Sequence, residues 1–231
     1  MLQPRVSVII PVFNEQDAIT NVLADLPAHL INEIIVVDNG STDATARLAS
    51  EAGARVVRED RKGYGSACLK GISVTDHPDI IAFIDGDYSD HPEELGRILA
   101  PLFTGQVDFC IGSRVLGNRE PGALLPQARF GNWLSTVLIS GFFGVDFTDL
   151  GPFRAIRSKT LEQMRMQDTT FGWTVEMQVK AAQMRVQTIE VPVSYRKRIG
   201  VSKITGTIEG TIKAGWKILY TIFKYAASPI N

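Results

Sequence analysis

Short apolar runs alternate with amphipathic stretches over the first half of the chain. Five runs rich in β-branched and aromatic residues predict strands, at residues 5–13, 33–38, 54–59, 80–85 and 107–114. Four stretches between them carry apolar residues at helical spacing, at 15–27, 41–53, 63–74 and 91–103. Because strands that alternate with helices are typical of parallel sheets, we expect a mostly parallel, doubly wound α/β sheet with helices on both faces.

The pattern changes after about residue 115, where a loop rich in Gly and Pro begins. The later elements predicted from periodicity are a helix at 128–144, a turn and short strand within 146–157, a helix at 172–184, a strand at 186–196 and, after a basic loop, a final helix. We see no segment long enough to be a linker. We therefore expect one domain over residues 1–206 and a C-terminal amphipathic helix over 207–231.

Composition narrows the class of protein. The 24 basic and 25 acidic side chains nearly cancel, so the overall charge does not favour nucleic acid as a partner. The N-terminal residues lack the order of a signal peptide, and no apolar run reaches the roughly 18 residues of a membrane-spanning helix. Cys68 and Cys110 lie in apolar segments without a paired spacing, which predicts reduced core residues. We expect a globular cytoplasmic protein.

Acidic residues gather where the fourth predicted strand ends. In open α/β sheets, ligands bind beyond the carboxyl ends of the strands. Asp85 and Asp87 stand there two residues apart, so both carboxylates can approach one hard cation such as Mg²⁺ or Mn²⁺. The alternative is that they only turn the chain. Asp90 is predicted to be a helix N-cap, with Glu93 and Glu94 complementing the helix dipole.

Two further segments border the same edge of the predicted sheet. Gly63 and Gly65 open a helix, but their segment lacks the last Gly of the dinucleotide fingerprint and the acid expected about twenty residues later. A Rossmann-type cofactor is therefore not expected, and the glycines instead permit close approach of a ligand or of another backbone segment. Asp38 ends the second strand, where its carboxylate can accept hydrogen bonds from a nucleobase.

The order of these segments resembles a known family. The inverting family 2 glycosyltransferases of GT-A fold have segments similar to VSVIIPVFNEQDAI, EIIVVDNGSTDATA, KGYGSACLKGI, FIDGDYSDHPEEL and VDFCIGSR. The branch that contains the dolichyl-phosphate mannose and glucose synthases has segments similar to TDLGPFRAIR, FGWTVEMQVKA and EVPVSYRKRIGVSKITG. The resemblance extends from residue 5 to about residue 215, and the ordered set is more specific than any single motif.

The resemblance implies a nucleotide-sugar-binding half, residues 1–114, and an acceptor-side half, residues 115–206. It places the nucleotide sugar against Pro11, Val12, Glu15, Asp38, Gly40, Lys62, Gly63, Gly65, Asp85, Gly86 and Arg196. Asp85 and Asp87 match the metal-binding DxD motif, and Ser89 stands where relatives often carry Gln as a further ligand to the cation. This departure leaves the further ligand and the donor open, so UDP- and GDP-sugars are both compatible.

The same resemblance implies catalysis by stabilisation of the leaving group. Arg114 is implied to face the diphosphate, and Arg198 and Lys203 belong to a basic loop that closes over it. An alcohol acceptor needs a carboxylate base, for which Asp149 and Glu176 are the candidates, whereas a lipid phosphate is already anionic and needs none. The structural alternatives are a turn residue for Asp149 and a surface acid for Glu176.

The last segment bears on the acceptor. From Ile208 onward, apolar and aromatic residues recur near helical spacing, with Lys213, Lys217 and Lys224 between them. Such a helix can lie in a membrane interface, or it can pack on the core or on another subunit. Because the similar synthases act on lipid carriers, we expect a peripheral enzyme on the cytoplasmic membrane face that transfers a hexose to a dolichyl or undecaprenyl phosphate. A homo-oligomer or a membrane partner subunit stays open.

Two other functions remain compatible with the sequence. A family 2 transferase can act on a hydroxyl of a glycan or glycolipid in place of a polyprenyl phosphate. A catalytically silent, nucleotide-sugar-binding scaffold subunit is the second alternative, and the presence of Asp85, Asp87 and Arg114 argues against it.

Overall fold

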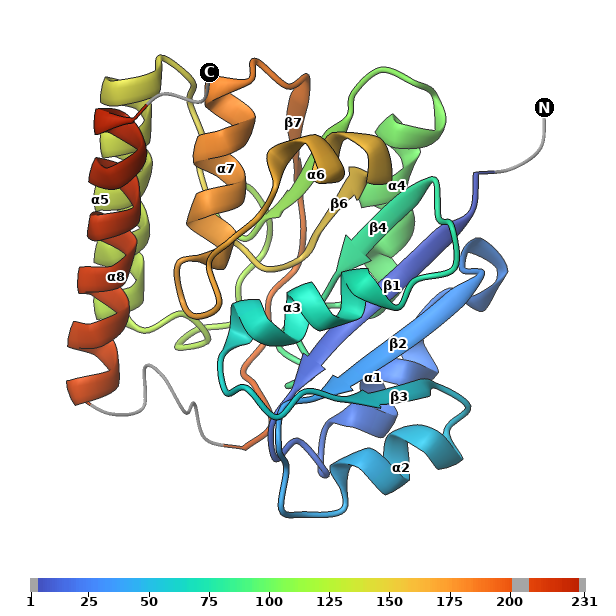
Figure 1. Ribbon diagram of the computed structural model, residues 1–231. Coiled ribbons are helices and arrows are strands. Elements are labelled where there is room, and N and C mark those ends of the chain that lie inside the picture. Colours follow the sequence, from blue (N-terminus) through green and yellow to red (C-terminus); the bar gives the residue numbers. More distant parts are fainter. Residues whose placement is uncertain (1–3, 201–207, 229–231) are drawn as a thin grey trace.

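The computed structural model describes residues 4–200 and 208–228 of the chain. Seven strands form one sheet in the order β3-β2-β1-β4-β6-β5-β7 (Figure 1). The strands are β1 (Val6–Val12), β2 (Glu33–Asp38), β3 (Arg55–Arg58), β4 (Ile80–Phe83), β5 (Phe109–Ser113), β6 (Arg154–Arg157) and β7 (Thr188–Pro192). Strand β6 runs antiparallel to β4 and β5, and the other neighbouring pairs are parallel.

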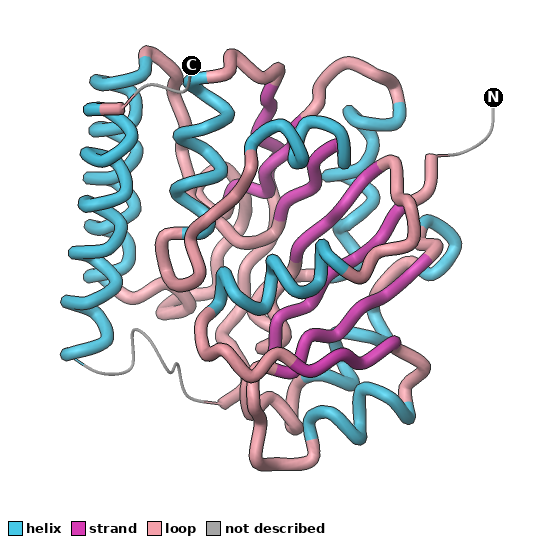
Figure 2. Tube along the Cα trace, viewed as in Figure 1, coloured by secondary structure: helices cyan, strands magenta, loops and turns pink. Residues whose placement is uncertain are grey.

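Helices cover both faces of this sheet, as Figures 1 and 2 show. One face carries α1 (Ile19–Asp25), α2 (Thr45–Glu51) and α4 (Leu95–Phe103). The core of the other face includes residues of α3 (Tyr64–Ser73), α5 (Pro126–Phe143), α6 (Ser158–Met164), α7 (Trp173–Gln183) and α8 (Ile208–Ala227). Two short 3₁₀ helices, η1 (Ala28–Leu30) and η2 (Pro92–Glu94), complete the described elements.

The central strand β1 explains why the sheet has two cores. Val8 and Ile10 pack into one core and Ile9 into the other, because successive side chains of a strand point to opposite faces. All three are fully buried. A run of apolar residues without alternation is what a strand covered on both faces requires, so the predicted mostly parallel, doubly wound sheet is confirmed.

Three local predictions differ from the structure. The strand predicted within 146–157 is β6, and its antiparallel direction was not predicted because an apolar run carries no information about strand direction. Helix α6 follows it directly and was not predicted. Helix α2 begins at Thr45 rather than near residue 41.

A buried acid ties α8 to the rest of the molecule. Glu176 on α7 is fully buried, and its carboxylate accepts hydrogen bonds from the amides of Gln167 (3.0 Å) and Asp168 (2.6 Å). It also accepts a hydrogen bond from the Tyr225 hydroxyl of α8 at 2.6 Å and pairs with Lys180 at 2.7 Å. Glu176 therefore joins α7, α8 and the loop before α7.

This network contradicts both interpretations of Glu176. The carboxylate does not line either cavity described below, and it is not a surface acid. The role of general base predicted for Glu176 is therefore wrong, because its oxygens are engaged inside the fold.

Replacing Glu176 should destabilise the fold. The Glu176→Ala variant leaves the Lys180 ammonium buried without its carboxylate, so we expect the free energy of unfolding to fall by about 3 kcal/mol or more. Urea denaturation followed by circular dichroism measures this change. The matched control is Glu162→Ala on the exposed side of α6, which should stay within about 0.5 kcal/mol of wild type. Equal effects of the two substitutions would contradict the anchoring role.

Candidate functional site

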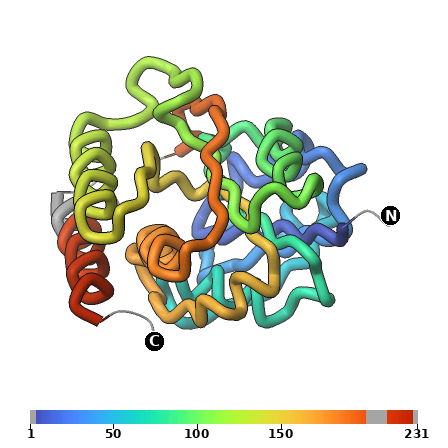
Figure 3. Tube along the Cα trace, turned by 90° about the horizontal axis from the view of Figure 1, so that it is seen from above, coloured from blue at the N-terminus to red at the C-terminus, as the bar shows by residue number. Residues whose placement is uncertain are grey.

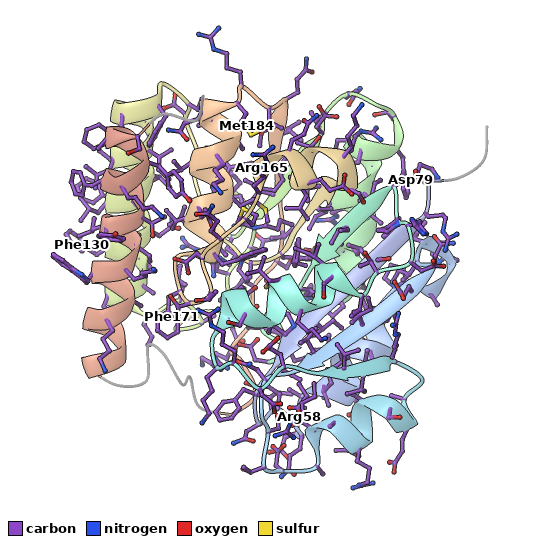
Figure 4. All side chains as sticks on the ribbon, viewed as in Figure 1. Arg58, Asp79, Phe130, Arg165, Phe171 and Met184 are labelled. Atoms are coloured by element: carbon purple, nitrogen blue, oxygen red, sulfur yellow. The ribbon has the colours of Figure 1, made fainter. Side chains whose placement is uncertain are left out.

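A cavity of about 290 Å³, the first cavity, lies at the carboxyl ends of β1, β2 and β4. Its lining consists of Pro11, Val12, Phe13, Glu15, Asn39, Lys62, Gly63, Tyr64, Ala67, Asp85, Gly86, Asp87, Phe171 and Arg198. Figure 4 labels Phe171 beside the start of α3. The structure thus brings together strand ends that the sequence singled out. Phe171 and Arg198 join them from two loops much later in the chain.

A second cavity of about 550 Å³ adjoins the first. The two share Tyr64, Asp85, Asp87, Phe171 and Arg198. From these residues the second cavity extends past Arg114, Tyr195 and Lys197 to the first half of α5 and of α8, where its wall is made of small and apolar residues, among them Leu124, Leu125, Ala128, Gly131, Ala214, Gly215 and Ile218. The site therefore has two compartments that meet at Asp85, Asp87 and Arg198.

Asp85 carries an unsatisfied carboxylate at this junction. Its Oδ1 atom is buried and forms no hydrogen bond of ordinary geometry with the residues that the structure describes, and the same holds for the hydroxyl of Tyr64, although these two groups lie close enough to shift each other's pKa. Burial and the neighbouring charge of Asp87 raise the pKa of Asp85 to about 7. A buried oxygen without a partner is unfavourable unless a ligand or proton satisfies it.

Asp87 is fixed by its neighbours. Its Oδ1 accepts hydrogen bonds from the Ser89 amide (2.9 Å) and the Ser89 hydroxyl (2.5 Å). Its Oδ2 lies 3.1 Å from Nη2 of Arg198, which also lies 3.2 Å from Oε1 of Glu15. One guanidinium therefore bridges the two acids.

The role of Ser89 as a metal ligand stays a prediction, and the structure gives its hydroxyl another contact. Ser89 is 1% exposed and lines neither cavity, since its hydroxyl is turned to Asp87. It orients the Asp87 carboxylate.

The acids at the junction fit a divalent cation in part. Within the described residues there is no cluster of three or more His, Cys, Asp or Glu side chains arranged to hold a metal ion. Asp85 and Asp87 still offer two carboxylates, one of them with an unsatisfied oxygen. Mg²⁺ and Mn²⁺ accept such a pair when other oxygen ligands complete the coordination, so the residues fit a cation that is held jointly with a bound substrate.

Arg114 is held in place by Asp149. Nε and Nη2 of Arg114 each lie 2.7 Å from one Asp149 oxygen, and the Arg114 amide donates a hydrogen bond to Oδ2 at 2.8 Å. The guanidinium lies 5.0 Å from the centre of the Tyr195 ring and lines the second cavity. Such a bidentate pair fixes the orientation of the arginine.

The same pair removes Asp149 as a base. Burial alone raises the pKa of Asp149, but the charge and hydrogen bonds of Arg114 outweigh it and hold that pKa below its ordinary value. Asp149 is fully buried and lines neither cavity. The predicted base role of Asp149 is therefore wrong, and the residue positions Arg114.

Several residues predicted to contact the nucleotide sugar lie elsewhere. Asp38 and Gly40 do not line the first cavity, and Asp38 accepts a hydrogen bond from the Ser41 amide at 2.9 Å, which holds the turn after β2. Arg196 donates from Nε to the carbonyl of Tyr88 at 2.9 Å and lies 3.5 Å from the centre of the Tyr88 ring. It therefore braces the loop after β4 from outside the cavities. Lys203 lies outside the described residues.

Gly65 serves a second segment of backbone. Its amide and that of Ser66 donate hydrogen bonds to the carbonyls of Thr170 (3.2 Å) and Thr169 (2.9 Å). A Cβ atom on Gly65 would collide with the carbonyl of Asp168. Of the two uses expected for this glycine, the structure thus has the approach of another backbone segment.

The N-cap predicted at Asp90 is also wrong. No side chain caps η2 or α4, and Asp90 is 1% exposed, with both carboxylate oxygens unpartnered within the described part of the chain. Burial first, and then the charge of Asp85, raise the pKa of Asp90 well above its ordinary value.

Sequence reasoning missed several lining residues. Phe13, Asn39, Tyr64 and Phe171 line the first cavity, and Tyr195 lines the second. Phe13 is the last residue of one predicted strand and Asn39 directly follows another, so their position at the strand ends was a usable signal. Asn39 also accepts a hydrogen bond from the Gly63 amide at 2.8 Å, which positions the glycine turn. The inclusion of Phe171 and Tyr195 depends on tertiary packing alone.

Comparison with known proteins identifies the class that this site belongs to. The family model of glycosyl transferase family 2 matches residues 7–173. An uncharacterized glycosyltransferase of Mycobacterium tuberculosis is 35% identical over 226 residues, which cover 95% of this chain and 100% of that protein. The undecaprenyl-phosphate mannosyltransferase of Micrococcus luteus is 30% identical over 224 residues, covering 89% of this chain and 90% of the relative.

A solved structure agrees in fold. Glucosyl-3-phosphoglycerate synthase from Mycobacterium tuberculosis, in complex with Mn²⁺, uridine-diphosphate-glucose and phosphoglyceric acid, superimposes with a TM-score of 0.78 at 21% identity, over 99% of this chain and 82% of that chain. The chain therefore has the GT-A fold and belongs to glycosyl transferase family 2. The resemblance seen in the sequence is confirmed, and the protein is a glycosyltransferase.

The pKa of Asp85 predicts a pH-dependent stability of the metal-free protein. Below pH 3.8 its carboxyl group is protonated in both states, and between 3.8 and about 7 the unfolded chain loses the proton while the folded chain keeps it. The folded state then binds more protons, so stability falls as the pH rises through this window. The Asp85→Asn variant lacks this effect. We therefore expect the unfolding free energy of the variant minus that of wild type to become more positive by more than about 1 kcal/mol as the pH rises from 4.5 to 7.5.

Urea denaturation in the presence of EDTA, at several pH values across that window, measures the difference. Asp76→Asn is the matched control, because the Asp76 side chain is 66% exposed and pairs with Arg5 outside both cavities. A constant difference between Asp85→Asn and wild type across the window would rule out the raised pKa.

Proposed function

We propose that this glycosyltransferase moves a hexose, with inversion, from a nucleotide-diphosphate sugar to a polyprenyl phosphate. The observation that carries the proposal is the wall of the second cavity. Near the junction the wall is basic, with Arg114, Lys197 and Arg198, and along α5 and α8 it is small and apolar. Such a compartment suits an acceptor with an anionic head and an apolar chain.

The acids around the second cavity support the same acceptor. Among the described lining residues, the acids are Asp85 and Asp87, and Arg198 already bridges Asp87 to Glu15. Asp149 and Glu176, the two carboxylates considered as bases, are engaged inside the fold. An alcohol acceptor needs a base to take its proton, whereas an acceptor phosphate is already ionised. With Asp85 and Asp87 assigned to the cation in this proposal, the described wall leaves no carboxylate to act as a base, which favours a phosphate acceptor over a glycan hydroxyl.

The first cavity is the compartment for the donor in this proposal. It adjoins the DxD acids and has Lys62 and Phe13 in its wall, which offer a charge and a ring to a nucleotide. The complexes of glucosyl-3-phosphoglycerate synthase with Mn²⁺ and uridine-diphosphate-glucose support a nucleotide sugar and a divalent cation here. Asp85 and Asp87 would hold the cation, Mg²⁺ or Mn²⁺, which supplies charge stabilisation to the departing diphosphate.

The residues of the chain supply the rest of the reaction. The bond from the anomeric carbon to the donor phosphate oxygen breaks, its electron pair leaves with the nucleoside diphosphate, and an acceptor phosphate oxygen forms the new bond from the opposite face. No proton is transferred. Arg198 borders both cavities, and its buried Nε has no hydrogen-bond partner in the described structure. This donor and the fixed guanidinium of Arg114 are available for negative charge that grows on the leaving group.

A lipid acceptor places the enzyme at a membrane surface. No helix among the described residues is long and apolar enough to cross a bilayer. The proposal therefore includes peripheral contact, on the face of the membrane where the nucleotide sugar is made.

Turnover with a lipid acceptor tests the function. Purified protein is incubated with Mg²⁺ or Mn²⁺, radiolabelled UDP- and GDP-hexoses and undecaprenyl phosphate, and the label that enters organic solvent is counted. We expect cation-dependent lipid label with one donor. Asp87→Asn should lower it at least about 100-fold, because it removes charge where the diphosphate departs. Asp76→Asn, remote from both cavities, should not change it.

Donor hydrolysis without lipid product would move the acceptor to a hydroxyl. Absence of donor binding with every nucleotide sugar would leave the scaffold subunit as the better interpretation.

Substitutions at two helical glycines can test acceptor binding separately from donor binding. Gly131 on α5 and Gly215 on α8 line the second cavity, and a Cβ atom on either meets nothing within 4 Å. The Gly131→Leu and Gly215→Leu variants should fill the acceptor compartment without clashing with the protein, and Leu is the better helix former by about 0.8 kcal/mol. We expect transfer to undecaprenyl phosphate to fall at least about tenfold while calorimetry finds donor affinity unchanged.

Gly141→Leu is the matched control for these variants. Gly141 lies on the same helix α5 with equally open space, but it lines neither cavity. Full transfer in the Gly131 and Gly215 variants would exclude the second cavity as the path of the acceptor.

A further inference from the structure

We infer that the outer face of α5 and α8 docks the enzyme on the interface of an anionic lipid bilayer. This inference deepens the proposed function and rests on it for the identity of the acceptor. We call the surface the docking face, and its residues are Phe130, Trp133 and Phe142 on α5 and Trp216, Tyr220 and Phe223 on α8.

The docking face leaves large aromatic side chains in solvent. Exposed fractions range from 50% for Phe142 and Phe223 to 72% for Trp216. Half of six aromatic side chains is on the order of 500 Å² of apolar surface, which is at the upper end of the largest patches on monomeric proteins. Figure 4 shows Phe130 pointing away from the body of the molecule.

Ring contacts link some of these residues within α5 and between the two helices. Figures 1 and 3 place α5 and α8 side by side at one edge of the molecule. The rings of Phe142 and Phe223 join the two helices, with their centroids 5.5 Å apart, and those of Phe130 and Trp133 lie 5.8 Å apart on α5. Single exposed apolar residues are ordinary on proteins, whereas several large exposed aromatic residues on two neighbouring helices indicate an interaction site.

Helical periodicity separates this face from the core. On α8, Trp216, Tyr220 and Phe223 follow the spacing i, i+4, i+7 and are exposed, while Ile222 and Tyr225 are buried. The inner side of α8 therefore already supplies the apolar contacts between this helix and the core. The outer aromatic residues are left for a partner.

The charges on α5 and α8 favour a lipid surface as the partner of the docking face. Helix α5 contains no Asp or Glu, and from Lys213 to the end of α8 there is none either. Lys213 and Lys224 are exposed on α8 and Arg129 is exposed on α5. Basic side chains around Trp, Tyr and Phe match the interface of a bilayer, where the cations meet anionic headgroups and the rings lie at the level of the acyl chains.

The position of the second cavity fits this orientation. Ala128 and Gly131 of α5, with Ala214 and Gly215 of α8, line the cavity on the same two helices that carry the docking face. An acceptor anchored in the bilayer by its chain would then enter between these helices, with its phosphate directed to Arg114 at the junction.

Vesicle binding tests the docking face. Full-length protein is floated with vesicles of phosphatidylcholine alone or with 30% phosphatidylglycerol, and tryptophan fluorescence is recorded with brominated lipids. We expect binding to the anionic vesicles and quenching of Trp133 and Trp216, with the buried Trp173 unaffected. The triple variant Phe130→Ser/Trp133→Ser/Trp216→Ser should bind at least about 50-fold more weakly, and Lys213→Gln/Lys224→Gln about 25-fold more weakly.

Matched controls lie on other surfaces. Ile189→Ser removes a 40% exposed apolar side chain of β7, and Lys159→Gln removes an exposed lysine of α6. Both should bind vesicles like wild type. A loss in the controls equal to that in the docking-face variants would overturn the inference.

A short-chain, water-soluble polyprenyl phosphate separates this inference from the proposed function. Turnover of this acceptor should be kept by the triple variant, whose three residues line neither cavity. If wild type turns it over but does not bind vesicles, the docking face is refuted and the proposed function stands. If wild type binds vesicles through this face but turns over no donor, the proposed function fails and the docking face stands. A third outcome is that wild type does not bind vesicles but forms a dimer in light scattering, and that the triple variant is a monomer. The docking face would then be a contact between two copies of the protein, and the inference would be overturned.

Discussion

Two carboxylates at the end of one strand determine how the rest of the site is built. Asp85 and Asp87 stand close together where water is partly excluded, so their negative charges repel each other. The protein offsets this repulsion in two ways: Asp85 keeps its proton up to about pH 7, and Arg198 places a cation 3.1 Å from Asp87. A divalent cation carries as much positive charge as the proton and the guanidinium together and can contact both carboxylates directly, which gives the pair a physical reason to bind one.

The second half of the chain holds these acids in position. The amides of Arg196 and Ile199 donate hydrogen bonds to the carbonyls of Ser89 (2.9 Å) and Asp87 (3.0 Å). Strand β6 lies between β4 and β5, and the loop that enters it places Asp149 against Arg114. The site is therefore a product of contacts between residues far apart in the sequence, and the first half of the fold supplies the acids together with one local contact, from Ser89 to Asp87.

This division explains what the sequence could predict. Periodicity predicted the strands and the sheet, and because ligands bind at the carboxyl ends of strands, it also placed Asp85, Asp87 and Glu15 at a cavity. Spacing cannot tell whether an acid near the site is free or already paired, so the sequence leaves Asp149 and Glu176 as candidate bases for an alcohol acceptor, although Arg114, Lys180 and Tyr225 engage them. Spacing likewise does not reveal the hydrogen bond from the Ser89 hydroxyl to Asp87.

The helix pair α5 and α8 borders the second cavity and also carries exposed aromatic side chains. A helix completes one turn every 3.6 residues, so residues close in sequence can have different surroundings. Gly131 and Gly215 line a compartment, while Trp133 and Trp216 stay exposed to solvent. The sequence displayed this pattern for the last helix alone, because the contribution of α5 depends on how the two helices pack. In the proposed reaction the water-soluble donor and the lipid-borne acceptor come from different phases. The two would meet where the two cavities share Asp85, Asp87 and Arg198, next to the helix pair that carries the proposed docking face.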